Sequence, residues 1–298
     1  MIKLRVPATS ANMGAGVDTL GVAVGLYNRM MIEESPEGLE VINKNTQSFI
    51  PQDTSNLIYR AMAGLFDYVG YEQKGYRITQ DSQIPMTRGL GSSSACIIGG
   101  MLAANIISGR QLSYQEIIHL AAKMEGHPDN VGPALFGGFC VSLMDDDKTI
   151  IKSTKLKSHI KFAVIIPDFF VATKKSRGVL PSKIDFKDAV FNVGHASMFQ
   201  AAMLTCDMKA LEIGVKDKLH QQYRKSYVDG MEDIFEKTYH LGSHATYLSG
   251  SGPTILSILD GNYDEFKAGM EEYFKTNGLE WKCMILPIDN VGAVVSEI

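Results

Sequence analysis

The sequence predicts an α+β fold. Predicted strands and helices follow one another along the chain without the regular strand–helix–strand order of a doubly wound sheet. The chain has 298 residues, of which 45% are hydrophobic, so it can bury a large core. That length corresponds to one large domain or two ordinary ones. We expect two domains, residues 1–150 and 151–298, with the boundary near residues 145–158, where an acidic turn lies between apolar segments.

The elements of the first half follow from hydrophobic periodicity. Residues 2–6 alternate between apolar and charged side chains, which predicts an opening strand, and residues 29–34 and 75–80 are predicted as further strands. Between these two, Thr54 or Ser55 is expected to cap a helix. The apolar residues that fall on one face of this helix are Ile58, Met62, Leu65, Phe66 and Val69.

Two helices are predicted after a glycine- and serine-rich segment at residues 88–100. The first, Ala95–Ile107, consists of small and apolar residues and is expected to be buried nearly all round. The second begins with a capping box formed by Ser113 and Glu116 and is expected to stop at Gly126.

The second half is read in the same way. The expected elements are strands at 136–144 and 160–167 on either side of the turn Asp145–Lys148, helices around 187–212 and 228–240, a strand at 245–248, a helix at 262–276 and two closing strands.

Charge and cysteine usage limit the partners and the compartment. The net charge is −4 and no long basic run occurs, whereas binding to nucleic acid needs a positive face. The four cysteines, Cys96, Cys140, Cys206 and Cys283, lack metal-ligand spacing, which favours free thiols in a reducing compartment. Because the sequence has neither a signal-like start nor an apolar run of membrane-spanning length, we expect a cytoplasmic protein with no membrane or nucleic-acid partner.

The segment Arg88–Gly100 has two interpretations. Gly89 and Gly91 allow a tight turn with positive φ, and Ser92–Ser94 follow where a helix begins. Exposed backbone N–H groups at a helix start, together with the positive end of the helix dipole, form an anion site. The alternative is an ordinary serine-capped helix after a glycine turn. A flexible linker is excluded, because an apolar helix follows immediately.

Other glycine-rich motifs fit this segment less well. The commonest phosphate loop needs a Gly-Lys dipeptide, and the chain contains none. A dinucleotide fingerprint would need a third glycine where Ser94 stands and a strand just before, which Pro85 interrupts. The missing strand also argues against a hydrolase nucleophile elbow at residues 91–95.

Two more small-residue segments, at residues 6–28 and 247–258, are also bounded by apolar residues. Each is therefore predicted to form a tight loop at the end of a core element. We expect the three loops to converge on one polyanionic ligand.

These three segments, in this order, resemble the three motifs of the GHMP kinase superfamily. Residues 85–95 are similar to its ATP-phosphate loop, which needs no lysine, and we call them the predicted phosphate loop. The resemblance assigns ATP binding to Asn56, Pro85, Arg88, Gly89, Leu90, Gly91, Ser92, Ser93, Ser94 and Ala95. Asn56 would contact the base or ribose, or else satisfy the backbone in a first helical turn. Arg88 would add charge, or else be an exposed loop residue.

Within the superfamily, the resemblance is closest to the homoserine kinases. The segments that carry it are residues 10–21, 126–138, 173–181 and 248–254, with Ala15 and Val17 where that family usually has Pro and Phe. The resemblance implies a two-domain GHMP kinase fold, with a ribosomal-protein-like N-terminal domain and a ferredoxin-like C-terminal domain. ATP and the amino acid would bind in the cleft between the two domains.

The resemblance also implies the roles of single residues. Glu125 ends a predicted helix, where a carboxylate is disfavoured by about 0.3–1 kcal/mol, and with Ser93 it would bind Mg²⁺. Asp18 would bind the ammonium of homoserine, Arg177 and Arg224 its carboxylate, and Asn12 its hydroxyl. Further substrate positions are His127, Thr173 and Gly252. Taken singly, Arg224 resembles a surface helix residue, His127 a structural histidine and Asp18 a helix cap.

The general base stays open between Asp129, Asn130 and none. Some relatives use an aspartate in this loop, but alignment from the following glycines puts Asn130 there, and an amide cannot take a proton as a carboxylate does. Asn12, Glu125 and Asn130 are therefore the predicted catalytic residues, with Asp129 structural. In this hypothesis the two asparagines orient the reactants and the hydroxyl proton passes to the phosphate.

The resemblance implies ATP- and Mg²⁺-dependent phosphorylation of the homoserine hydroxyl to O-phosphohomoserine, a step of threonine biosynthesis, by a homodimer. The alternatives are a GHMP kinase acting on mevalonate or a sugar, or a GHMP-fold sensor without catalysis. Asp18, Arg177 and Arg224 argue against mevalonate, which has no ammonium. Ser93 and Glu125 argue against the sensor.

Overall fold

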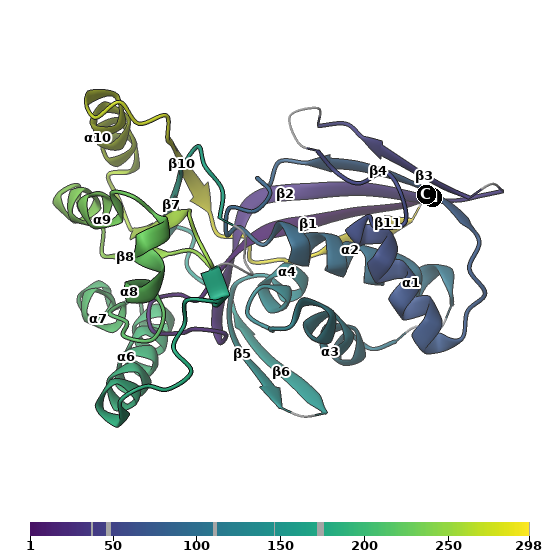
Figure 1. The fold of residues 1–298 in the computed structure, drawn as a ribbon, viewed down its shortest axis with the longest axis horizontal. Helices are drawn as coiled ribbons and strands as arrows, with labels where there is room; N and C mark the ends of the chain where they lie inside the picture. The colour runs from purple at the N-terminus through teal and green to yellow at the C-terminus, as the bar shows by residue number, and fades with distance from the viewer. Residues whose placement is uncertain (37, 46–48, 110–111, 146, 172–175, 298) are drawn as a thin grey trace.

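A computed structural model describes residues 1–36, 38–45, 49–109, 112–145, 147–171 and 176–297. The described residues form two β-sheets with helices, and the predicted α+β class is confirmed. In Figure 1 the long strands β1 (Ile2–Ala11) and β2 (Leu20–Ser35) and the first helices lie at one end, and the second sheet lies at the other.

The first sheet has seven strands among the described residues, in the order β11-β1-β2-β4-β3, with β5 beside β2 and β6 beside β5. Among the described strands of this sheet, the pair that runs parallel is β3 and β4. The other bounds are Leu39–Asn43 for β3, Gly75–Ser82 for β4, Phe139–Asp145 for β5, Lys148–Thr154 for β6 and Val294–Glu297 for β11.

Four helices cover one face of this sheet (Figure 1). They are α1 (Leu57–Val69), α2 (Ser92–Ile107), α3 (Tyr114–Glu125) and α4 (Val131–Phe136). The predicted capping box of α3 is present, and Gly126 ends that helix in the left-handed conformation. Helix α2 is buried without interruption from Ser94 to Ala104, as its small and apolar residues predict.

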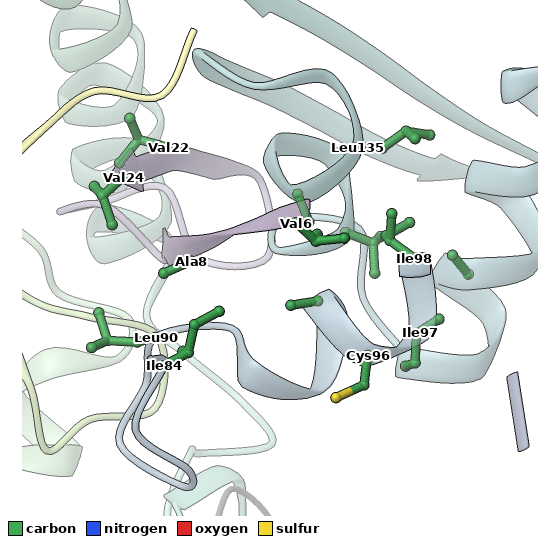
Figure 2. Close-up of a cluster of buried hydrophobic side chains, with 14 of the residues drawn as sticks. Val6, Ala8, Val22, Val24, Ile84, Leu90, Cys96, Ile97, Ile98 and Leu135 are labelled. Carbon is green, nitrogen blue, oxygen red and sulfur yellow. The ribbon is translucent and has the colours of Figure 1, made fainter. Parts of the chain in front are cut away.

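Figure 2 shows a cluster of buried hydrophobic side chains that includes Leu90 of the predicted phosphate loop. Val6 of β1 lies toward Ile98 of α2, whereas Ala8 of the same strand lies on the side of Leu90 of the loop and of Ile84. All five side chains are buried. The apolar side chain of Leu90 therefore fixes the loop to the core, while its glycines and serines remain at the surface of a cavity described below.

The second sheet has the order β10-β7-β9-β8, and its strands are antiparallel. Alternate residues of β7 enter two cores: Phe162 and Val164 pack with α6 and α7, and Ala163 and Ile165 pack with α9 and α10. The bounds are Lys161–Ile166 for β7, Ala245–Leu248 for β8, Ile255–Leu259 for β9, Lys282–Pro287 for β10, Phe186–Thr205 for α6, Met208–Gly214 for α7, Gln221–Arg224 for α8, Met231–His240 for α9 and Tyr263–Thr276 for α10.

Three predicted elements need correction. The helix predicted at 187–212 is two helices, because Cys206 adopts the left-handed conformation and Asp207 starts α7. Asn56, rather than Thr54 or Ser55, caps α1, and its side chain accepts hydrogen bonds from the N–H groups of Ile58 and Tyr59. The turn after β5 leads into β6, a strand that we did not predict because its exposed face breaks the apolar pattern.

The division into residues 1–150 and 151–298 stays a prediction. The change from one sheet to the other falls between β6 and β7, after residue 154. At the other end of the chain, β11 pairs with β1, so the last strand lies in the first sheet. The first sheet therefore contains both ends of the described chain.

Two further observations concern the cysteines and the helices. Cys96, Cys140 and Cys283 are buried free thiols, and Cys206 is partly buried. None of the helices in the described ranges has the length and apolar character that crossing a membrane requires.

The contact between α1 and α2 depends on a glycine that can be tested. A Cβ on Gly100 would lie 2.4 Å from the backbone oxygen of Ile58, whereas a Cβ on Gly64 of α1 would meet no atom within 4 Å. We expect Gly100→Ala to destabilise the fold by about 1–3 kcal/mol, because the helices must separate. Gly64→Ala, the control, should stabilise it by about 0.5–1 kcal/mol. Thermal unfolding of both variants is the measurement, and equal shifts would contradict the packing described here.

Candidate active site

The predicted phosphate loop ends in a helix start that is built to receive an anion. Gly91 is the N-cap of α2 in the left-handed conformation, and no side chain caps the helix. The first N–H groups of a helix have no partner within the helix. Here Ser92 and Ser93 line a cavity at this helix start. These N–H groups and the positive end of the helix dipole therefore favour a negatively charged ligand.

The three small-residue loops converge, as predicted. The side chain of Ser249 donates to the backbone oxygen of Gly89 and contacts the hydroxyl of Ser10. The N–H of Thr9 donates to the backbone oxygen of Leu90. Residues of all three segments therefore contribute to a single hydrogen-bonded cluster, although Thr9 and Ser10 of the first segment lie at the end of strand β1 and not in a loop.

Ser93 and Glu125 lie together at the same helix start. The Ser93 hydroxyl is 2.5 Å from Glu125 Oε1, and the Ser94 hydroxyl donates to the same oxygen at 3.0 Å. Glu125 is the last residue of α3, and Gly126 turns the chain away behind it. The cluster offers hydroxyl and carboxylate oxygens, which are the ligands that a hard divalent cation prefers. The residues present therefore fit the predicted magnesium ion.

The cavity has a volume of about 140 Å³ and collects most of the predicted residues. Its lining residues are Asn12, Pro85, Thr87, Arg88, Gly89, Leu90, Gly91, Ser92, Ser93, Glu125, His127, Asn130, Arg177, Arg224, Gly250 and Ser251. Among the predicted ATP-binding residues, Ser94 and Ala95 lie just behind it and are buried.

A second cavity of about 140 Å³ shares Thr87, Ser92 and Ser93 with the first. Its other lining residues are Ile50, Pro51, Asn56, Leu57, Gln80, Met86 and Cys96. Most of this lining is apolar, so the second cavity suits a flat, weakly polar group attached to the anion in the first. Asn56 faces this cavity and also caps α1, so both interpretations of Asn56 have a structural basis.

Arg88 lines the first cavity, but its guanidinium is bonded to the second sheet. It donates to the backbone oxygens of Pro167 and Asp168 at 3.1 and 2.7 Å. Arg88 therefore connects the predicted phosphate loop to the end of β7.

Asp18 and Arg177 form a two-pronged ion pair. The guanidinium nitrogens of Arg177 lie 2.6 and 3.3 Å from the two carboxylate oxygens of Asp18. Burial lowers the pKa of Arg177, but the hydrogen bond and the charge of Asp18 outweigh it, so the pKa is raised. Both side chains are more than one third exposed. A charged pair at the cavity rim suits a zwitterionic ligand, which offers the opposite charge to each partner.

Arg224 differs from its surface-helix interpretation, because its side chain is 1% exposed. The guanidinium donates to the backbone oxygens of Gly250 and Ser176 and contacts Nδ1 of His220. Within the described ranges no carboxylate forms an ion pair with it. Burial lowers the pKa of Arg224, with the nearby charge of Arg177 acting in the same direction. A buried cation at a cavity wall favours an anionic ligand.

The two predicted catalytic asparagines are nearly buried and face the cavity. Asn12 has a positive φ of 56°, and its side chain accepts from the N–H of Asp18. The side-chain oxygen of Asn130 accepts from the Thr9 hydroxyl at 2.8 Å. Each side-chain oxygen is used within the protein, so each amide NH₂ group is the part left to contact a ligand.

His127 and Asp129 form a close pair beside Glu125. Nδ1 of His127 lies 2.7 Å from Oδ1 of Asp129, which is 1% exposed. Burial lowers the pKa of His127, but the hydrogen bond and charge of Asp129 and the charge of Glu125 outweigh it, so the pKa is raised. Asp129 therefore orients His127, as its predicted structural role requires.

Asp18, His127 and Asp129 also place one donor atom each within 4.8 Å of one another, in the part of the chain that the structure describes. Asp18 is bound by Arg177, and Asp129 by His127. Arg177 is a cation that already occupies the carboxylate of Asp18, and His127 occupies an oxygen of Asp129 that a metal ion would need. The set is therefore a poorer fit for a metal ion than Ser93 and Glu125.

Three predicted substrate residues are not among the residues that line the cavity. The first is Asp18, which is connected to the cavity through its ion pair with Arg177. Gly252 is buried behind the cavity, which is lined by the preceding Gly250 and Ser251 instead. Thr173 lies outside the described residues. The sequence reasoning missed Thr87 and the second cavity, for which a turn position and scattered apolar residues gave no local motif.

Comparisons with known proteins show the family of the chain. The sequence profile of the GHMP kinases N terminal domain matches residues 56–138. The homoserine kinase of Clostridium beijerinckii is 44% identical over 298 residues, which cover 100% of this chain and 99% of the relative. That of Caldicellulosiruptor saccharolyticus is also 44% identical, over 100% of this chain and 97% of its own.

A solved structure shares the fold over nearly the whole length. The crystal structure of homoserine kinase from Cytophaga hutchinsonii matches with a TM-score of 0.88 at 24% sequence identity, covering 99% of this chain and 97% of that one. Because relatives named homoserine kinase are 44% identical over the whole length of the chain, the chain belongs to the homoserine kinase family of the GHMP kinases.

Proposed function

We propose that the protein transfers the γ-phosphoryl group of ATP to the side-chain hydroxyl of L-homoserine. The observation that carries this proposal is that one cavity joins an uncapped helix start, the Ser93–Glu125 oxygen pair and the cations Arg177 and Arg224. Phosphoryl transfer needs positioning and charge stabilisation more than covalent chemistry. This cavity offers both.

The triphosphate would bind at the start of α2. The N–H groups after Gly91 and the hydroxyls of Ser92 and Ser93 are the available donors. The adenosine would extend into the second cavity, toward Asn56 and Met86. Ser93 and Glu125 would hold Mg²⁺, which neutralises phosphate charge when bound.

The amino acid would bind through opposite charges on the other side of the cavity. Asp18 is the partner for its ammonium, and Arg177 and Arg224 are the partners for its carboxylate. Arg224 is buried and Arg177 is at the rim, so a carboxylate between them would be partly shielded from water. His127, fixed by Asp129, would close the same side of the pocket.

The acceptor hydroxyl would then lie between Asn12 and Asn130. Its oxygen forms the new bond to the γ-phosphorus while the bond to the ADP oxygen breaks, and the proton passes to the transferred phosphate. Both asparagines contribute by orientation, since an amide does not accept a proton at neutral pH. We further propose that the protein is cytoplasmic, because its buried free thiols suit a reducing compartment. From the family likeness we also propose that it is a homodimer.

The substrate is tested with a panel of acceptors. ADP release is measured with homoserine, mevalonate, shikimate and galactose at equal concentration. We expect turnover on homoserine to exceed that on each of the others by at least about 100-fold, because only homoserine carries both charges that the site addresses. A maximum on any other acceptor would overturn the proposal.

The magnesium assignment is tested by Glu125→Gln. This variant keeps the side-chain shape and can still accept from Ser93, so the fold should keep its thermal stability. We expect kcat/KM to fall by about 100-fold or more, because metal stabilisation of transferred phosphate charge is worth several kcal/mol. Glu272→Gln, on an exposed face of α10, is the control. Full activity of Glu125→Gln would refute the assignment.

The substrate carboxylate is tested by Arg177→Gln. We expect the KM for homoserine to rise by about 10- to 100-fold with little change in the KM for ATP, since a charge-assisted hydrogen bond contributes about 1.5–3 kcal/mol. Arg77→Gln is the matched control, because Arg77 forms an exposed ion pair with Glu40 away from the site. A change confined to the KM for ATP would show that Arg177 belongs to the other half of the cavity.

A further inference from the structure

Behind Arg224 lies a buried histidine that the proposed function does not use. His220 is 0% exposed and precedes the four-residue helix α8, which ends with Arg224. Its Nδ1 is 3.2 Å from Nη1 of Arg224, and its Nε2 is 2.8 Å from the backbone oxygen of Gly14. Both ring nitrogens therefore have a partner inside the protein.

These contacts fix the protonation state of His220. An arginine N–H can only donate, so Nδ1 of His220 must accept and carries no proton. A carbonyl oxygen can only accept, so Nε2 carries the proton and donates to Gly14. Burial lowers the pKa of His220, and although the charge of Asp217 opposes this effect, the pKa stays below its ordinary value. The neutral ring required by the hydrogen bonds is thus also the favoured one.

Asp217 holds the start of α8 in place. Its carboxylate accepts from the N–H groups of Leu219, His220 and Gln221 at 2.7–3.0 Å. It also accepts from the side chain of Asn192, which in turn donates to the backbone oxygen of Ala15. The backbone of His220 is therefore fixed independently of its ring.

The same contacts connect two parts of the proposed substrate site. Gly14 and Ala15 belong to the β1–β2 loop (residues 12–19), which carries Asn12 and Asp18. The His220 ring is hydrogen-bonded to this loop through Nε2 and to Arg224 through Nδ1. The His220 ring therefore connects the loop of the proposed ammonium partner to the buried carboxylate partner, and its Nδ1 is the acceptor in this connection that faces the Arg224 guanidinium.

We infer that His220, as the neutral tautomer protonated at Nε2, is a positioning residue that holds the Arg224 guanidinium where the carboxylate of an amino-acid substrate requires it. This inference rests on the proposed function. His220 contacts neither substrate nor nucleotide in this scheme. It acts through Arg224, so its loss affects homoserine binding more than ATP binding or the chemical step.

Two polar substitutions separate the two hydrogen bonds. The side-chain amide of asparagine reaches the position of Nδ1, so His220→Asn keeps an acceptor for Arg224 and gives up the bond to Gly14. The amide of glutamine reaches the position of Nε2, so His220→Gln keeps a donor for Gly14 and leaves Arg224 without its acceptor. His119→Gln is the control, since His119 contacts Thr149 at a distance from the site.

We expect His220→Gln to raise the KM and the calorimetric Kd for homoserine by about tenfold, with kcat and the KM for ATP within about twofold of the original protein. His220→Asn should stay within about threefold in all four quantities. A merely structural role would change both variants alike and would not separate homoserine from ATP. Equal effects of the two variants, or an unchanged KM for homoserine in His220→Gln, would overturn the inference.

The outcome is separable from that of the proposed function. If the unmodified protein does not phosphorylate homoserine, the proposed function fails. If it does, and His220→Gln binds homoserine normally, the inference alone fails. Thermal unfolding shows whether each variant is folded. Should His220→Gln not fold, His220→Asn still decides, because a tenfold rise in its KM for homoserine contradicts the inference and a normal value supports it.

Discussion

The arrangement of the site depends on the close contacts at two glycines, Gly89 and Gly91, in the predicted phosphate loop. A Cβ on Gly89 would stand 2.2 Å from the backbone oxygen of Ser249, and a Cβ on Gly91 would stand 1.9 Å from the hydroxyl of Thr9. Only glycine permits this approach, and both residues also adopt positive φ. The start of α2 is thereby pressed against β1 and the 249–252 loop, which brings three distant parts of the sequence to one cavity.

Local patterns predicted the elements whose cause is local, and they failed where the cause is tertiary. The capping box at Ser113 and the buried helix α2 follow from spacing and composition alone. In contrast, the pattern around Arg224 is that of a surface helix, because its neighbours are polar. Its burial arises from the carbonyl of Gly250 and from His220, which no local periodicity reveals.

The charges of the site divide it into two chemically different halves. On one side, backbone N–H groups and serine hydroxyls are uncharged donors, and Glu125 supplies an anionic carboxylate. On the other, Arg177, Arg224 and Asp18 supply full charges in a partly or fully buried setting. An anion without a metal ion would be attracted to the arginines rather than to the helix start. The metal ion expected at Ser93 and Glu125 would therefore also direct the triphosphate to the correct half.

This division explains how the loop functions without the lysine of the commonest phosphate loop. Arg88, the cation nearest in sequence, directs its guanidinium to the backbone oxygens of Pro167 and Asp168, which follow β7. A flexible lysine at the helix start would compete with the metal ion for the carboxylate of Glu125 and would add a third cation near the amino-acid half. Dipoles fixed by the backbone avoid this competition, because they stabilise phosphate charge without attracting the carboxylates that bind the metal.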